Sequence, residues 1–228
     1  MHEEKLFLDV IVNPHTMPHF VSYSLLVSVI LIVVALIVRA SIKLIPRGTQ
    51  NFMEVVVESL LNLCEENIGH HWARHLFPMI ATIGLFIVVG NFLGLIPAST
   101  SPTANVNVNA AMAVPVFLAT HIYGVRVHGF SYIKHFLGPI RSIAALPLML
   151  LMFVIEVIGH LARPMTLSVR LLGNMSAKHY LLLVLGILIA PVVPSAILAL
   201  GVLVSVIQAF VFTLLSALYL AGAVEEAH

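Results

Sequence analysis

Long apolar stretches are the feature that most constrains this chain of 228 residues. A helix that crosses the hydrocarbon core of a bilayer needs about 20 mainly apolar residues, and Phe20 to Ile42 satisfies this requirement. Only 9% of the residues are charged, and 60% are hydrophobic. Because a soluble domain carries roughly 25% charged residues, a surface of this composition would not remain dissolved in water. The sequence therefore predicts an all-α integral membrane protein.

Further apolar stretches bring the expected total to about five transmembrane helices. The second, Leu76 to Ile96, is ended by Pro97, and the third runs from Val106 to Val125. The stretch from Ile143 to Ala190 is too long for one upright span, so it forms either two spans or one long, strongly tilted helix. The last helix is expected over Val193 to Ala223.

Two amphipathic segments are expected to lie at the membrane surface. Thr49 to Ile68 mixes glutamates with valine and leucine, and Arg126 to Arg141 is also amphipathic. The chain contains no internal repeat, so residues 1–228 are expected to form a single membrane domain. The first residues lack the pattern of a signal or transit peptide, which favours a multi-pass protein of the bacterial inner membrane.

The distribution of Lys and Arg predicts the orientation of the loops. Ala98 to Asn105 contains neither residue, whereas the regions before and after it are basic, so this segment and the N-terminus are expected outside. A single crossing by Ile143 to Ala190 places the C-terminus inside, and a double crossing places it outside. The loop rule leaves both open. The basic residues are Arg39, Lys43, Arg47, Arg74, Arg126, Lys134 and Arg141.

Composition disfavours several classes of function. A formal net charge of +1 gives no electrostatic case for nucleic-acid binding, and the sequence contains no P-loop. The only cysteine, Cys64, excludes an internal disulfide and argues against a thiolate metal site. Histidines such as His121, His128 and His135 could ligate haem or a metal, as in a membrane haem carrier. No second ligand set lies at membrane depth, so neither a cofactor nor a metal is expected.

Ionisable residues gather on one face of the segment from Glu156 to His179. A charge at bilayer depth costs roughly 2.5–3.5 kcal/mol on insertion scales, so such residues usually face protein or a water path. At about 100° per residue, the polar side chains fall within roughly 40° of one line, interrupted by Leu167, while His179 points away. This polar stripe consists of Glu156, His160, Arg163, Arg170, Asn174 and Lys178.

Arg170 is the residue of this stripe that most needs a partner. Long apolar runs lie on both sides of it, and its guanidinium remains protonated. Glu156 lies about four helical turns away, roughly 21 Å along a straight helix, and no other carboxylate is an obvious partner. We therefore expect another chain to supply the negative charge. For Glu156, Arg163 and Lys178, the alternative is that they lie at helix ends, on either side of a turn at Pro164, and reach the two interfaces.

A second polar stripe lies on the last expected helix. Gln208 must find hydrogen-bond partners inside the membrane, either by joining helices or by lining an ion path, and spacing leaves both open. A deep arginine also suits a proton-coupled secondary transporter, although transporters commonly contain inverted repeats and none is found here. The same helix face carries Gly201, Ser205, Phe212, Ser216 and Tyr219.

Several of these segments resemble one protein family. RPMTLSVRLLGNMSAKH, from Arg163 to His179, resembles the signature helix of the ATP synthase a subunit, in which an arginine is followed by Leu-x-Gly-Asn-Met. IQAFVFTLLSALYL, from Ile207 to Leu220, and the acidic tail resemble the last helix and C-terminus of that family. NFMEVVVESLLNL, GNFLGLIP and SPTANVNVNAAMA are similar to its earlier segments. The chain as a whole therefore resembles subunit a of the membrane (Fo) sector of a bacterial F-type ATP synthase.

The resemblance implies an ion-channel subunit of a rotary motor rather than an enzyme. Family members provide two offset aqueous half-channels beside a ring of c subunits, each of which carries a membrane-embedded carboxylate. The arginine that matches Arg170 attracts this carboxylate and blocks direct leakage between the half-channels. Ion flow then turns the ring, and ATP forms on other subunits; the resemblance favours protons as the ion but leaves sodium open. The implied partners are the c-ring, the peripheral-stalk b subunits, the rest of the complex and membrane lipid, without nucleic acid.

The resemblance also implies roles for individual residues, none of them catalytic. Asn174 and Gln208 match polar positions near the arginine. Glu156 matches an acidic position of the inner half-channel, and His179 lies where the family often places an acid or a histidine in the outer one. The last-helix position that often complements His179 is Gly201 here, so protons could pass through His179 itself or mostly through water. Secondary channel-lining residues are expected at Asn105 (often aspartate in the family), Ser205, Lys178 and Arg163.

Overall fold

The structure, a computed structural model, describes residues 17–40, 42–43, 48–96, 99–129, 132, 146–188 and 192–224, and within these ranges it contains helices and turns but no strand. Helices α1, α3, α4, α6 and α7 are each long and apolar enough to cross a membrane. The predicted all-α integral membrane protein is therefore confirmed. The elements are α1 (His19–Ala40), α2 (Thr49–Ile68), α3 (His70–Leu93), the 3₁₀ turn η2 (Pro102–Ala104), α4 (Val106–His128), α6 (Leu146–Leu188) and α7 (Val192–Val224).

The helix boundaries follow the apolar pattern of the sequence, with one clear difference. α2 has the bounds expected of the amphipathic segment, whereas α3 begins at His70, well before the expected Leu76. Gly69, with a φ of 84°, forms the sharp bend between α2 and α3. Helix α3 begins directly after this bend, so its polar first turn is helical as well. Most of the expected surface segment Arg126 to Arg141 lies outside the described residues.

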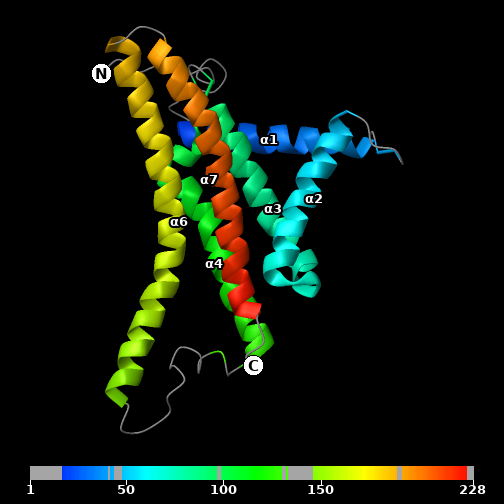
Figure 1. Ribbon diagram of the computed structural model, residues 1–228, viewed down its shortest axis with the longest axis vertical. Coiled ribbons are helices and arrows are strands. Elements are labelled where there is room, and N and C mark those ends of the chain that lie inside the picture. The colour runs from blue at the N-terminus through cyan, green and yellow to red at the C-terminus, as the bar shows by residue number, and fades with distance from the viewer. Residues whose placement is uncertain are drawn as a thin grey trace.

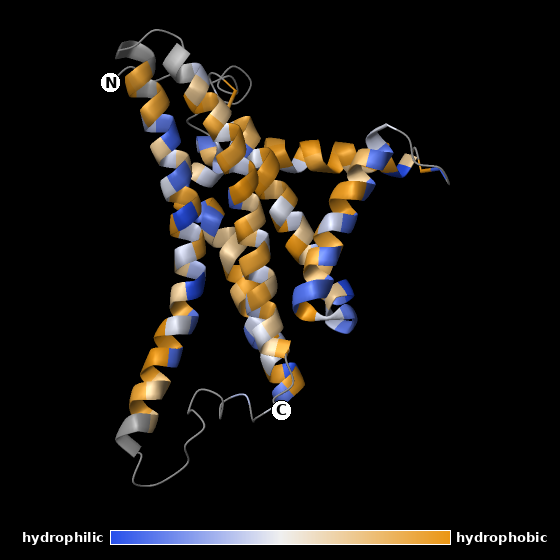
Figure 2. Ribbon diagram, in the orientation of Figure 1, coloured by the Kyte–Doolittle hydropathy of each residue, from blue (hydrophilic) through white to orange (hydrophobic). Residues whose placement is uncertain are grey.

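Helix α1 stands apart from the others in direction and surroundings. In Figure 1 the axis of α1 runs crosswise to the axes of α6 and α7, and in Figure 2 the helix is coloured mostly hydrophobic. Its 22 residues correspond to about 33 Å, which matches an upright span. Tyr23 and Val27 are buried, while half of its other residues are exposed and the rest are partly exposed. In a membrane protein this exposed apolar surface faces lipid or a partner helix.

The core of the molecule forms around α7, which packs against α2, α3, α4 and α6. One buried cluster joins α2, α3, α4 and α7 around Cys64, Leu76 and Leu220, and a second joins α3, α4, α6 and α7 around Ile87, Leu171 and Phe212. Small residues bring these helices close together, as is usual in membranes. The remaining buried members of the two clusters are Ile68, Ala73, Ile80, Met112, Ala113, Val116, Ala119, Leu167, Ala209, Ala217 and Val224.

Helix α6 decides between the two alternatives that the sequence left open. It is one continuous helix of 43 residues, about 64 Å long, which is roughly twice the thickness of the hydrocarbon core. Pro164 lies inside it, and the backbone is helical on both sides, so the structure has no turn at this residue. α6 extends along the longest dimension of the molecule, and the axis of α1 runs crosswise to the axis of α6 (Figure 1). If α1 is upright, α6 is strongly tilted.

Candidate functional site

Helices α6 and α7 bring the two predicted polar stripes together along their contact. Asn174 Nδ2 donates a hydrogen bond to Gln208 Oε1 at 2.6 Å. Gln208 is 4% exposed, so this bond satisfies a buried amide that lipid could not satisfy. The two stripes meet at this pair, about one helical turn after Arg170.

The stripe on α7 packs inward. Ser205, Phe212 and Ser216 are 0%, 2% and 1% exposed. Ser205 Oγ donates to Gly201 O at 2.7 Å, and Ser216 Oγ donates to Phe212 O at 2.8 Å. Their hydroxyls are thus satisfied within their own helix, and their small size permits close packing. Of the two interpretations that spacing left open, the structure supports helix packing for this face.

Arg170 lies exposed beside this contact. The neighbouring face of α6 is buried through apolar residues, with Leu167, Leu171 and Met175 at 2%, 0% and 1% exposure. Among the residues that the structure describes, no carboxylate pairs with the guanidinium and no group accepts a hydrogen bond from it. A cation on the outer face of a membrane helix needs a negative partner. In this arrangement the partner must approach from outside the chain's own core.

The N-terminal half of α6 carries a second group of predicted residues. His160 Nε2 lies 3.2 Å from Glu156 Oε1, and the His160 ring meets the His121 ring of α4 edge to face, with centroids 5.2 Å apart. Arg163 stacks over the Tyr219 ring of α7, with 5.1 Å between its Cζ and the ring centroid. These contacts hold His160 against α4 and Arg163 against α7, whereas Glu156 contacts His160 of its own helix.

The contact between His121 and His160 is relevant to the hypothesis that histidines of this chain bind haem or a metal. Their rings are almost perpendicular, with an interplanar angle of 89°. In the described part of the chain, no group of three or more His, Cys, Asp or Glu side chains gathers closely enough to hold a metal ion. His121 therefore acts here as a packing neighbour of His160. The sequence did not group His121 with the polar stripe, because His121 lies on α4 and only the tertiary contact between α4 and α6 brings it to His160.

The C-terminal half of α6 lines a cavity of about 160 Å³ together with the loop that follows α3. Lys178 and half-buried His179 both line it, although they leave the helix in different directions. Thr100, Ser101 and Ser176 also line this cavity, while the Ser101 hydroxyl itself donates to Gly90 O at 2.9 Å. The structure thus places His179 and Lys178 together beside the loop after α3, which the distribution of Lys and Arg predicts to be outside.

A buried polar network that the sequence analysis missed joins α3, η2, α4, α6 and α7. Thr103 Oγ1 donates to Asn91 Oδ1 at 2.6 Å, and Asn91 Nδ2 donates to Ser205 O at 3.4 Å. Asn109 Nδ2 donates to Thr103 O at 2.9 Å and to Ser168 O at 3.2 Å. Asn91, Thr103 and Asn109 are each 0% exposed. The available signal was the presence of asparagines within two otherwise apolar spans.

Asn105, predicted as a secondary channel residue, has a local structural role. It is the N-cap of α4, and its Oδ1 accepts a hydrogen bond from Asn107 N at 2.9 Å. Such a cap satisfies one of the unpaired amide groups at the start of a helix. Its side-chain hydrogen bond is therefore local to the start of α4, while its backbone N donates to Pro102 O of η2 at 3.2 Å.

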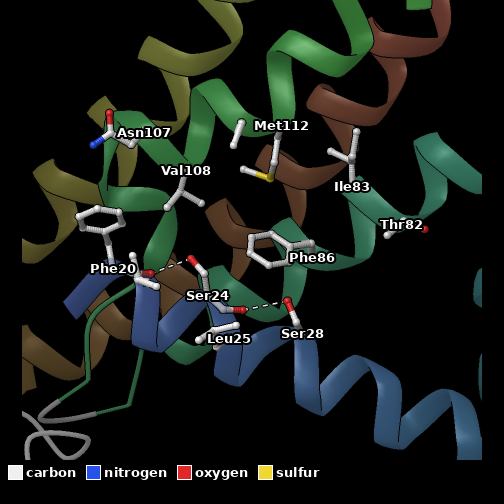
Figure 3. Close-up of a pocket in the computed structure, with 12 residues that line it drawn as sticks. Phe20, Ser24, Leu25, Ser28, Thr82, Ile83, Phe86, Asn107, Val108 and Met112 are labelled. Carbon is white, nitrogen blue, oxygen red and sulfur yellow. Dashed lines mark hydrogen bonds between the residues drawn. The ribbon is translucent and has the colours of Figure 1, made fainter. Parts of the chain in front are cut away.

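An apolar cavity of about 460 Å³ lies between α1, α3 and α4 (Figure 3). Phe20, Phe86 and Met112 line it, and none of its lining residues belongs to α6 or α7. Ser24 and Ser28 donate their hydroxyls to backbone oxygens of their own helix, at 2.7 Å and 3.0 Å. This cavity is therefore separate from the polar site.

Comparison with known proteins agrees with this arrangement. Residues 21–221 match the family described as ATP synthase A chain. The chain is 52% identical over 209 residues to ATP synthase subunit a of Trichlorobacter lovleyi, covering 91% of this chain and 88% of that protein. The chain belongs to the ATP synthase subunit a family. Over the same shares of both chains, it is 50% identical to subunit a of Geobacter sulfurreducens and 46% identical to that of Geotalea uraniireducens.

Membership of the subunit a family identifies the chain as a component of the proton-translocating Fo sector of ATP synthase. It therefore functions with the rest of that complex, in ATP synthesis and proton transport. Bacterial relatives and five apolar helices indicate a multi-pass protein of the bacterial inner membrane. Membership of this family argues against a proton-coupled transporter, which the deep arginine had suggested. It also argues against a haem carrier, which the histidine spacing had suggested.

Proposed function

We propose that this chain is the ion-translocating stator subunit that guides protons to and from a rotating c-ring. It provides two half-channels to the ring carboxylates, and Arg170 separates them. Glu156 belongs to the inner half-channel and His179 to the outer one, while the peripheral-stalk b subunits hold the chain still. The subunit itself is non-catalytic, because ATP forms on other subunits of the complex.

The exposed position of Arg170 carries this proposal. Its guanidinium lies at the edge of the α6–α7 contact without a partner among the described residues, while the Asn174–Gln208 bond holds the helix beside it. A carboxylate brought to this edge by another chain would pair with Arg170 in a low-dielectric environment, where attraction is stronger than in water. As each ring subunit passes, its carboxylate would exchange one proton on either side of this charge.

A crosslinking experiment tests which chain approaches this edge. A cysteine replaces Asn174, one turn from Arg170, and Cys64 is replaced by Ser to remove the native thiol. Cysteines are then placed along the ring helix, and disulfide formation is measured in membranes that contain the whole complex. We expect crosslinks at ring positions near the carboxylate.

The matched control is a cysteine at Met165, which is 66% exposed on the same helix. Nine residues at about 100° each place it roughly opposite Asn174 around α6. It should not crosslink to the same ring positions. An assembled complex in which Asn174→Cys forms no ring crosslink, or in which both cysteines crosslink equally, would contradict the proposed rotor-facing side of α6.

A further inference from the structure

Asn109 on α4 donates a hydrogen bond into the turn of α6 that carries Arg170. The side chain is 0% exposed, and its Nδ2 lies 3.2 Å from Ser168 O and 2.9 Å from Thr103 O. Ser168 precedes Arg170 by two residues, which corresponds to about 3 Å along the helix axis and about 200° around it. The turn is therefore held on its inner side, while Arg170 is exposed on the outer side.

The contact between α4 and α6 around this bond is apolar. Met112, Ala113, Leu167 and Leu171 belong to one buried cluster there. Apolar contacts are non-directional, and lipid is as apolar as these side chains, so such a surface fixes the axial position of a helix only loosely. A hydrogen bond needs a defined distance and angle, and a single buried asparagine can set the register of packed helices.

The other bond of the Asn109 amide leads to a firmly held part of the fold. Thr103 Oγ1 donates to Asn91 Oδ1 of α3 at 2.6 Å, and both residues are 0% exposed. The 3₁₀ turn η2, which contains Thr103, contacts α1, α3, α4 and α6. Asn109 thus ties α6 to a base formed by α3 and η2 as well as to α4.

The Asn109 amide is held at a cost. Its Oδ1 is buried and accepts no hydrogen bond from the residues that the structure describes. A buried acceptor without a donor is destabilising, so the side chain contributes less to stability than its two donated bonds alone would suggest. A defined position of α6 is the other benefit that a buried polar group of this kind can provide.

We propose that Asn109 is a positioning residue that fixes the register of α6 and thereby the place of Arg170 at the rotor-facing edge. This inference rests on the proposed function, in which Arg170 meets the carboxylates of a moving ring. A binding group works well only when it is held within roughly 0.5 Å of its productive place. Because the ring moves past the outer side of α6, this restraint has to come from the inner side, where Asn109 bonds.

Ala177 provides a reporter of this register. It is exposed on α6, and seven residues at about 100° each place it within about 20° of Arg170 around the helix. Ala177→Cys in a Cys64→Ser background leaves both side chains of the Asn174–Gln208 bond in place. Single cysteines are introduced along the ring helix, and the disulfide yield at each ring position is measured in membranes that contain the whole complex. This parent should give a narrow profile with one clear maximum.

Two substitutions remove the bond to α6 in different ways. Asn109→Leu keeps an apolar side chain of similar size without a donor. Asn109→Ser adds no bulk, and its hydroxyl can bond within its own helix, as the Thr120 hydroxyl does with Val116 O at 2.8 Å. For both variants we expect the yield at the best ring position to fall severalfold while neighbouring positions gain. ATP-driven pumping per assembled complex should also fall severalfold.

Leu76→Ala is the matched control for a general loss of stability. Leu76 is 2% exposed and belongs to the buried cluster that contains no residue of α6. This variant should lower the thermal stability at least as much as Asn109→Ser and leave the crosslinking profile unchanged. A profile that spreads equally in Leu76→Ala, or that stays unchanged in an assembled Asn109→Ser complex, would overturn the positioning role. Failure of both Asn109 variants to assemble would assign Asn109 to folding and overturn it as well.

The same profiles distinguish this inference from the proposed function. If the parent crosslinks to the ring and Asn109→Ser changes neither the profile nor the pumping rate, only this inference fails. If neither Ala177→Cys nor Asn174→Cys crosslinks to any ring position in an assembled complex, the proposed function fails, and the inference fails with it.

Discussion

The polar residues of this chain occupy two regions with opposite solutions to the same problem. In the network of α3, η2 and α4, Asn91, Thr103 and Asn109 are fully buried and bond to groups of their own chain. On the exposed edge of α6, Arg170 has no partner among the described residues. Both regions lie in spans where an unpaired polar group is costly. The difference teaches that the first region is completed within the fold, whereas we propose that the second is completed by another chain.

The two regions are physically connected at α6. Asn109 Nδ2 donates to Ser168 O, two residues before Arg170. The internal network therefore holds the turn of α6 that carries the exposed arginine. A rigid internal support is what positions an exposed charge against a partner that moves past it.

The largest expected effect comes from removing the exposed charge. Arg170→Ala should abolish ATP-driven proton pumping while the complex still assembles, because no described contact within the chain depends on the guanidinium. Pumping is measured in inverted membrane vesicles, and assembly by the ATPase activity retained on the membrane. Arg74→Ala is the matched control, since Arg74 is also exposed and lies at the surface near Glu65. Normal pumping by an assembled Arg170→Ala complex would remove Arg170 from the mechanism.

A substitution in the internal network should affect stability first. Asn109→Leu removes the donor to Thr103 O and Ser168 O and leaves buried carbonyl groups with fewer partners. We expect a loss of about 1–3 kcal/mol in the free energy of unfolding, measured on the purified subunit or complex in detergent. Asn107→Leu is the control, because Asn107 is exposed on the same helix. Equal stability of the two variants would show that the network contributes little.

The Asn174–Gln208 bond lies between the two regions, and we expect it to contribute both to stability and to pumping. A double-mutant cycle with Asn174→Ala and Gln208→Ala should give a coupling energy of about 0.6 kcal/mol, and at most about 1.7 kcal/mol, as for other hydrogen bonds between membrane helices. Each single variant should also reduce pumping partially, because the bond holds the helix beside Arg170. Additive effects on stability would indicate that the two side chains do not act together.

The smallest effect is a difference in thiol reactivity between the interior and the exposed edge. Cys64 is 0% exposed, and burial raises the pKa of its thiol to about 11. Since the thiolate is the reactive form, alkylation of Cys64 should be slow at neutral pH and rise only as the pH approaches that value. The same raised pKa means that the folded state binds this proton more tightly than the unfolded state, so its contribution to stability is present below about pH 9 and is lost as the pH rises towards 11.

A cysteine at Asn174 provides the comparison for this last measurement. It lies on the exposed edge of α6 and should react faster than Cys64 with a small maleimide in the detergent-solubilised subunit. Similar rates for the two thiols at pH 7 would contradict the burial of Cys64 between α2, α3 and α7.

The sequence alone determined the helices and the candidate residues. The bounds of α2 were predicted residue for residue, and the other spans were placed within about three residues except at the start of α3, because hydropathy and amphipathic period are local properties. The polar stripe on α6 and the need of Arg170 for an external partner also followed from composition and spacing. The family motif supplied the roles of Glu156 and His179, which stay predictions.

Only the tertiary structure decided how these faces are used. Spacing could not tell whether the stripe of Gln208 lined a path or packed; in the structure Gln208 is buried and bonds to Asn174 of α6, while its part in proton transfer stays a prediction. Nor could it show that α6 continues through Pro164, that Asn109 reaches Ser168, or that Lys178 lies over Gly201. Periodicity defines which residues share a face, but the neighbour that each face meets depends on contacts between residues far apart in the chain.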